Sequence, residues 1–226
     1  MLVRNWMNKK VITVDVDDSM QEATRLLKEH NIRMLPVMKK DKLVGILTDR
    51  DLKEASASDA TTLEIHELLY LLSKIKVKDI MTKKPITVSP DYTIEETAQI
   101  LLEKKISGVP VVDQDGKIAG TITQSDIFKA LISLTGLAKR GIQFAFQLED
   151  RPGSIKEVAD IIRKYGGRMA SILSSYDRVP QGHRNVYIRM YDVDRSKLDQ
   201  IIEELKKKAT ILYMVDHRED KRMIYE

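Results

Sequence analysis

An internal repeat limits the fold of this chain more than any other feature of its sequence. When the 226 residues are laid over themselves, residues 9–17 match residues 83–91 at an offset of 74. A Gly-x-x-Thr-x-x-Asp motif then recurs at residues 45–51 and 120–126, at an offset of 75. Two copies indicate a domain duplication, because a solenoid needs more repeats to bury its faces.

Each copy predicts the order strand, helix, strand, strand, helix. The apolar spacing is extended in the strands and helical in the segments that follow Asp17-Asp18-Ser19 and Ser89-Pro90-Asp91. We expect residues 1–57 and 77–136 to form two such domains. The expected strands are 12–14, 34–38 and 43–47 in the first copy and 86–88, 109–112 and 117–122 in the second, with final helices after Thr48 and Thr123.

The segment between the copies has its own pattern. Residues 58–76 place leucine and isoleucine side chains on one broad face of a helix. A simple tether would be polar, so we expect a connecting helix that packs between the copies or on a partner.

The C-terminal third differs from the repeat. After a linker at 137–141, residues 142–216 predict the order βαββαβ, which is the ferredoxin-like layout. The turn at 150–153 combines Pro with Gly, and Gly166-Gly167 marks the end of the first helix. Residues 217–226 predict a solvated or partner-facing tail. The whole chain is therefore of the α+β class.

The composition excludes several kinds of function. The chain has no Cys, its four His are far apart, and no apolar run approaches the length of a membrane span. The start MLVRNWMNKK lacks the apolar core of a signal peptide, so we expect a cytoplasmic protein with no membrane partner. The net charge of +4 is spread widely and aromatic residues make up 5%, so no nucleic-acid partner is expected.

The repeated Thr-x-x-Asp motif has two interpretations. In one, Thr caps a helix and the acidic residue closes a capping box, with no ligand implied. In the other, the helix N-terminus and the Thr hydroxyl hold phosphate oxygens, while the carboxylate accepts ribose hydroxyls. Recurrence of the whole pattern in both copies favours a ligand site. Arg50 in the first copy offers a phosphate contact where the second has Ser125.

On these motifs the two copies resemble a tandem pair of cystathionine-β-synthase (CBS) domains, a Bateman module. The resemblance implies a β-α-β-β-α fold for each copy and a cleft that binds AMP, ADP, ATP or S-adenosylmethionine as a regulatory ligand, with no catalytic cofactor. No metal ligands are assigned, because the spacing of the four His argues against a His-based site, although a carboxylate-bound ion stays open. Transferred by position, the nucleotide-binding residues are Thr13, Met34, Leu35, Pro36, Val37, Thr48, Arg50 and Asp51 in the first copy and Thr87, Ser107, Gly108, Val109, Pro110, Val111, Thr123, Ser125 and Asp126 in the second.

Residues 142–216 resemble an ACT domain, and the order of the three domains resembles the bacterial acetoin-utilisation B protein family. The ACT resemblance implies an amino-acid site at the turn formed by Asp150, Arg151, Pro152 and Gly153. The same turn is also ordinary loop chemistry in a βα connection. Together the resemblances imply a non-catalytic sensor that regulates a metabolic enzyme or regulator. Exposed apolar faces on small duplicated modules favour a homodimer.

Three other functional classes compete with the sensor. An enzyme has little support, because no Ser-His-Asp or Cys-His set can be assembled. An interaction scaffold without bound nucleotide remains an alternative, although both motif Asp residues are present. A nucleic-acid-linked regulator has only the sequence pI near 9.0 in its favour.

Overall fold

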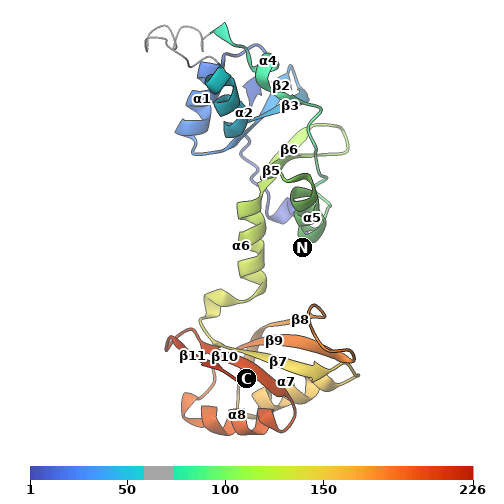
Figure 1. The fold of residues 1–226 in the computed structure, drawn as a ribbon, viewed down its shortest axis with the longest axis vertical. Coiled ribbons are helices and arrows are strands. Elements are labelled where there is room, and N and C mark those ends of the chain that lie inside the picture. Colours follow the sequence, from blue (N-terminus) through green and yellow to red (C-terminus); the bar gives the residue numbers. More distant parts are fainter. Residues whose placement is uncertain (59–73, 226) are drawn as a thin grey trace. The chain divides into compact units, whose positions relative to one another are not determined.

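The structure is a computed structural model that describes residues 1–58 and 74–225 (Figure 1). Two compact units divide the chain, Met1–Ala130 and Leu131–Glu226. The division falls inside a helix, before the linker expected at 137–141. Most of the connecting helix expected at 58–76 lies outside the described residues.

The N-terminal unit contains the two copies of the repeat. The first copy has the predicted order β1, α1, β2, β3, α2, and the second has α5, β5, β6, α6. Their bounds are η1 (Val3–Asn5), β1 (Val14–Asp15), α1 (Met20–Glu29), β2 (Met34–Lys39), β3 (Lys42–Thr48), α2 (Asp49–Ser58), α4 (Val77–Ile80), β4 (Thr82–Lys83), α5 (Ile94–Lys104), β5 (Gly108–Val112), β6 (Ile118–Thr123) and α6 (Gln124–Leu134).

Capping explains where the first helix of each copy begins. Ser19 Oγ accepts the backbone N–H of Glu22 before α1, as expected from the polar run that precedes it. Before α5, Thr93 and Glu96 form a complete capping box. The strand expected at 86–88 is wrong: only Val88 forms a bridge, to Val111. Pro110, the residue before Val111, has no N–H to donate, so the parallel ladder cannot extend from Val88 to Ile86.

The start of each copy packs against the other copy. Val3 is buried in the core of the second copy, and Asn8 pairs with Thr121 through two backbone hydrogen bonds of 2.8 and 3.0 Å. Conversely, Val77 is buried in the core of the first copy, where β4 pairs with β3. Figure 1 shows the N-terminus beside α5 of the second copy. The two copies therefore exchange their first segments, which the sequence repeat did not predict.

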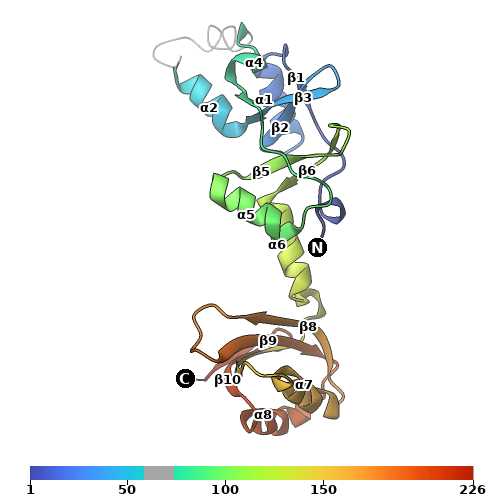
Figure 2. The ribbon, with the colours of Figure 1, turned by 90° about the vertical axis from the view of Figure 1, so that its right-hand side faces the viewer.

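The C-terminal unit is an antiparallel five-stranded sheet of order β11-β10-β7-β9-β8. Its helices α7 and α8 cover one face, as Figure 2 shows, and the buried core lies between them and the sheet. The βαββαβ order is as predicted. Its elements are η2 (Leu137–Lys139), β7 (Ile142–Glu149), α7 (Ser154–Lys164), β8 (Arg168–Ser175), β9 (His183–Tyr191), η3 (Arg195–Lys197), α8 (Leu198–Lys206), β10 (Thr210–Asp216) and β11 (Lys221–Ile224).

Residues 217–225 differ from the solvated or partner-facing tail that the sequence predicted. Asp220 adopts a left-handed φ of 48° and turns the chain back, so that β11 pairs with β10. Met223 and Tyr225 then pack against the core. The mixed charges of the segment favour a tail, but Met223 and Tyr225 have the alternating spacing of an edge strand, which the prediction missed.

Candidate functional site

The two Thr-x-x-Asp motifs have the same geometry at the starts of α2 and α6. In the first copy, Oδ2 of Asp51 accepts hydrogen bonds from the backbone N–H and from Oγ1 of Thr48, both at 2.7 Å. In the second, Oδ2 of Asp126 accepts the same two bonds from Thr123 at 3.0 and 2.7 Å. Each Thr–Asp pair caps the start of its helix, as the capping interpretation requires. The other carboxylate oxygen of each Asp, Oδ1, takes no part in this pairing.

The glycine of the motif allows the other copy's first segment to cross closely. A Cβ on Gly45 would lie 2.5 Å from Sδ of Met81, and a Cβ on Gly120 would lie 2.8 Å from Sδ of Met7. A Cβ on Gly120 would also lie 2.9 Å from the carbonyl oxygen of Asn8. Neither glycine has a left-handed φ, so the motif requires glycine for space rather than for backbone conformation.

A cavity of about 520 Å³ lies at the start of α6 and takes its walls from both copies. Its volume falls within the range of small-molecule sites. The exchange of first segments explains the mixed lining, because residues 8–12 cross from the second copy to the first at this place. The lining residues are Asn8, Lys10, Ile12, Asn31, Ile32, Arg33, Met34, Ser107, Gly108, Thr121, Thr123, Gln124, Ser125, Asp126 and Lys129.

The cavity carries a net charge of +2, from three cations and one carboxylate in its lining. The cations Lys10, Arg33 and Lys129 come from both copies. Lys129 Nζ lies 3.1 Å from Oδ1 of Asp126, and the two side chains are 70% and 15% exposed. An ion pair with one partner so exposed contributes about 0.5 kcal/mol or less. A ligand can therefore displace Lys129 from Asp126 at little cost.

The first copy has a different charge pattern at the equivalent helix start. The repeat offset places Glu54 where the second copy has Lys129. Nε of Arg50 donates to Oε1 of Glu54 at 2.8 Å, and both side chains are exposed. This hydrogen bond and the charge of Glu54 raise the pKa of Arg50. The Arg50 guanidinium is thus already paired with a carboxylate, and the first helix start is more acidic than the second.

Six of the residues predicted to bind nucleotide line this cavity together, namely Met34, Ser107, Gly108, Thr123, Ser125 and Asp126. Thr13 lines another cavity of about 640 Å³, beside Met38 and Lys117. Thr87 is exposed. The other predicted strand residues have buried side chains in the two cores or strand interiors: Leu35, Pro36, Val37, Val109, Pro110 and Val111. In this structure they support the cavity and do not line it.

Sequence reasoning missed the residues that cross from one copy to the other. Lys10, Asn31 and Arg33 belong to the first copy, yet they face a helix start of the second. A comparison of the chain with itself shows which residues correspond, but not which copy they contact. The offset of 74 matches Lys10 with Lys84, and that match does not indicate which helix start either lysine faces.

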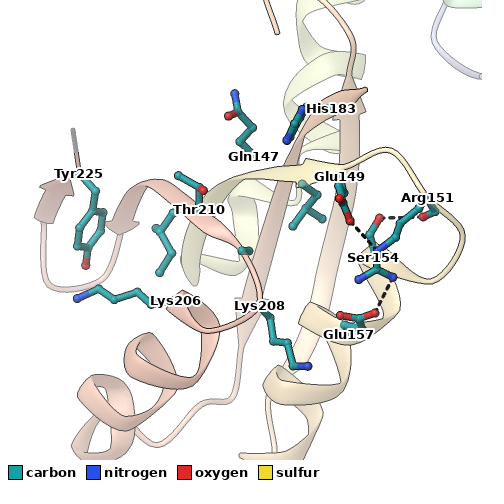
Figure 3. Close-up of a pocket in the computed structure, with 13 residues that line it drawn as sticks. Gln147, Glu149, Arg151, Ser154, Glu157, His183, Lys206, Lys208, Thr210 and Tyr225 are labelled. Atoms are coloured by element: carbon teal, nitrogen blue, oxygen red, sulfur yellow. Dashed lines mark hydrogen bonds and ion pairs between the residues drawn. The ribbon is translucent and has the colours of Figure 1, made fainter. Parts of the chain in front are cut away.

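The turn predicted to bind an amino acid borders a cavity of about 560 Å³ in the C-terminal unit. Figure 3 shows Arg151 and Glu157 on one side of it and Lys206 and Tyr225 on the other. Arg151 bridges Glu149 and Glu157 at 2.9 and 2.8 Å, and these carboxylates raise the pKa of the guanidinium.

The remaining residues of that turn have other positions. Asp150 accepts a hydrogen bond from the hydroxyl of Tyr176 at 3.3 Å, and Gly153 has a left-handed φ of 88° before α7. Only Arg151 of the four residues from Asp150 to Gly153 lines the cavity.

Comparison with protein families matches the CBS domain to residues 3–58 and 77–133, which is half of the chain. The chain belongs to the CBS-domain family. A CBS domain-containing protein of Dictyostelium discoideum is 33% identical over 134 residues, which are 59% of this chain and 92% of the relative. Inosine-5′-monophosphate dehydrogenase of Korarchaeum cryptofilum is 42% identical over 124 residues, but the match spans 55% of this chain and only 23% of that enzyme.

The N-terminal unit is also similar to solved structures of CBS pairs. The CBS domain pair of protein MJ0100, in complex with 5′-methylthioadenosine and S-adenosyl-L-methionine, is 32% identical with a TM-score of 0.50. It matches 58% of this chain and 99% of that one. The CBS-pair protein CBSX2 from Arabidopsis thaliana is also 32% identical, with a TM-score of 0.51, and the match covers 58% of this chain and 94% of that one. In the part of the chain that the structure describes, no helix is long and apolar enough to span a membrane.

Proposed function

We propose that this CBS-domain protein is a non-catalytic regulator that senses an adenosyl ligand in the cavity at the start of α6. The observation that carries the proposal is the cavity itself, where the carboxylate of Asp126 lies among three cations contributed by both copies. The complex of a similar CBS pair with two adenosyl compounds supports this ligand class.

The residues of the cavity match the parts of such a ligand. Thr123 holds Oδ2 of Asp126, so Oδ1 can accept ribose hydroxyls once Lys129 moves away. Lys129 and the start of α6 are then available to a phosphate. Ile12, Ile32 and Met34 supply apolar surface for a base.

The charge of the cavity selects among adenosyl ligands. A net lining charge of +2 attracts the phosphates of AMP, ADP or ATP, whereas S-adenosylmethionine carries a cationic sulfonium. We therefore propose that a nucleotide is preferred at this site. The first helix start, with Glu54 in place of Lys129, is the weaker phosphate site.

Further parts of the proposal concern the second signal and the partner. An amino acid bound near Asp150–Gly153, in a domain of the ACT type, would supply a second input. Exposed apolar side chains on α6, including Phe128 at 58% and Ile132 at 51%, support a homodimer. The regulated partner would be a metabolic enzyme or regulator, with acetoin utilisation as the candidate pathway.

One observation favours a second candidate, an interaction scaffold with no bound nucleotide. Both motif Asp residues are already satisfied by their Thr partners, so the helix starts need no ligand for their stability. In that case the shared geometry of the two motifs is a pair of helix caps.

Calorimetric titration of the full chain with AMP, ATP and S-adenosylmethionine tests the proposal. We expect AMP or ATP to bind, Asp126→Ala to abolish binding, and Asp51→Ala, which removes the same cap in the other copy, to retain it. Lys129→Glu, at an exposed position, should weaken nucleotide binding without unfolding the helix start. Failure of all three ligands to bind the wild-type chain would leave the scaffold.

A further inference from the structure

The C-terminal unit has a second cavity besides the one beside Arg151. It lies at one end of the sheet and takes no residue from the CBS pair. It has a volume of about 420 Å³ and opens where β7 begins and β9 ends. It does not share a residue with the cavity beside Arg151. The residues that line it are Lys139, Arg140, Gly141, Ile142, Arg168, Met190, Tyr191, Asp192, Val193, Arg195 and Arg218.

The lining of this cavity is strongly cationic. Five of its residues carry positive charge and one, Asp192, carries negative charge. Among the described residues, neither Lys139 nor Arg140 forms an ion pair. Arg168 lies 3.8 Å from Asp192, and both side chains are largely exposed. Arg195 pairs with Asp216, and Nε of Arg218 lies 3.9 Å from Oε1 of Glu219. Lys139 and Arg140 are therefore the two lining cations without a close counter-charge among the described residues, and their charge attracts an anion into the cavity.

Two interactions fix the directions of these cations. Nζ of Lys139 and the guanidinium of Arg168 both lie over the ring of Tyr191, at 5.3 and 5.2 Å from its centre. Arg195 donates two hydrogen bonds to Asp216, at 2.8 and 3.1 Å. Asp216 is only 3% exposed, so it holds Arg195 from behind. Such preorganised cations lose little freedom when an anion binds.

The backbone brings Arg140 to the cavity by a close approach that only glycine permits. A Cβ on Gly141 would overlap the carbonyl oxygen of Met190. Gly141 therefore lets the chain run against the end of β9. Arg140 itself has a left-handed φ of 45°, which turns it from η2 into the start of β7.

We propose that this cavity binds a small, multiply charged anion of the phosphate class. The planar guanidinium groups of Arg140, Arg168 and Arg218 match phosphate oxygens in pairs. The charge surrounds a hollow rather than forming a stripe along the surface, and this arrangement fits a small molecule better than a nucleic acid. Because Lys139 and Arg140 follow α6 along the chain, a bound anion would tie the segment after that helix to the end of β9.

Titration of the full chain with inorganic pyrophosphate tests this site. We expect saturable binding to the wild-type chain that weakens as salt is raised. The double variant Lys139→Gln/Arg140→Asn should bind at least tenfold more weakly. Asn is chosen at position 140 because it tolerates the left-handed conformation better than most residues.

Two matched variants distinguish binding in this cavity from general charge attraction and from binding in the CBS cavity. Lys207→Gln/Arg178→Asn removes the same charge elsewhere in the unit, and Arg178 also has a left-handed φ, of 56°. Lys10→Gln/Lys129→Gln removes two cations from the CBS cavity. Both should keep the pyrophosphate binding that depends on Lys139 and Arg140 within about twofold of wild type.

Three results would overturn the proposal. One is equal weakening in the matched variants, which would mean general charge attraction. Another is loss of binding only with Lys10→Gln/Lys129→Gln, which would place the anion in the CBS cavity. The third is a dissociation constant weaker than about 1 mM for pyrophosphate together with oligonucleotide binding that depends on Lys139 and Arg140.

Discussion

Replacement of Gly120 by alanine should destabilise the N-terminal unit and weaken its ligand site together. The new Cβ would meet Sδ of Met7 at 2.8 Å and the carbonyl oxygen of Asn8 at 2.9 Å. The Met7 side chain can move, but the Asn8 carbonyl accepts the backbone N–H of Thr121 at 3.0 Å. The crossing segment must therefore shift as a whole.

The size of the effect follows from two opposing contributions. Overpacking of this kind costs about 1–3 kcal/mol. Replacing Gly with Ala also lowers the conformational entropy of the unfolded chain, which stabilises the folded unit by about 0.4–1 kcal/mol. The expected net loss is about 1–2 kcal/mol, which lowers the melting temperature by about 3–8 °C for a unit of this size. Because Asn8 and Lys10 line the cavity, nucleotide affinity should fall too.

Urea denaturation followed by circular dichroism, and calorimetric titration with AMP, measure the two effects. A second variant, Met7→Ala in the Gly120→Ala background, removes the side-chain clash but leaves the clash with the Asn8 carbonyl. We expect this variant to bring no full recovery. A Gly120→Ala protein as stable as wild type would show that the crossing segment is not tightly held, and the reasoning would fail.

Three further predictions rest on single contacts. Thr123→Val removes the hydroxyl that donates to Asp126 at 2.7 Å and should cost about 1 kcal/mol in urea denaturation, and Thr48→Val should cost a similar amount in the first copy. Glu54→Lys should strengthen phosphate binding at the first helix start, measured by ATP titration of an Asp126→Ala background, because it supplies the cation that Lys129 provides in the second copy. Burial opposes ionisation of Asp216, but hydrogen bonds from Arg195 and from the backbone of Arg218 and Glu219 outweigh it and lower its pKa. A carboxyl whose pKa is lowered in the folded state stabilises the protein at pH values above its unfolded pKa, near 3.9. The melting temperature measured against pH should therefore show this stability lost as the pH falls below about 4. The Asp216→Asn variant should lack that loss.

The fold was predictable where the signals are local. The helix start after Asp17-Asp18-Ser19 and the helix end at Gly166-Gly167 are each encoded within a few residues, and the structure confirms them. The cap of α5 is Thr93, two residues beyond the predicted run Ser89-Pro90-Asp91. The βαββαβ order of the C-terminal unit follows from the same kind of pattern.

The candidate site was only partly predictable, because it depends on contacts between distant segments. Thr123 and Asp126 could be found from the motif, but Lys10 reaches it where the first segment crosses between the copies, and Arg33 reaches it from the loop before β2 of the other copy. The apolar Leu35 and Val109 were predicted to contact a base, but β2 and β5 are buried along most of their length and both side chains lie in the cores. The sequence has Lys129 in the second copy and Glu54 at the equivalent position of the first. Only the structure shows that Lys129 pairs with Asp126 in the lining of the cavity.

The exchange of first segments has a consequence for how the protein forms during synthesis. Asn8 leaves the ribosome early, yet its partner Thr121 is made only after nearly all of both copies. The first copy in turn waits for Val77 to complete its core. Neither half can finish folding alone, so contact order is high and folding is slow for a unit of this length. The same dependence makes the CBS cavity appear late, since a chain that ends before the last residue of β6 lacks Thr123, Asp126 and the other lining residues at the start of α6.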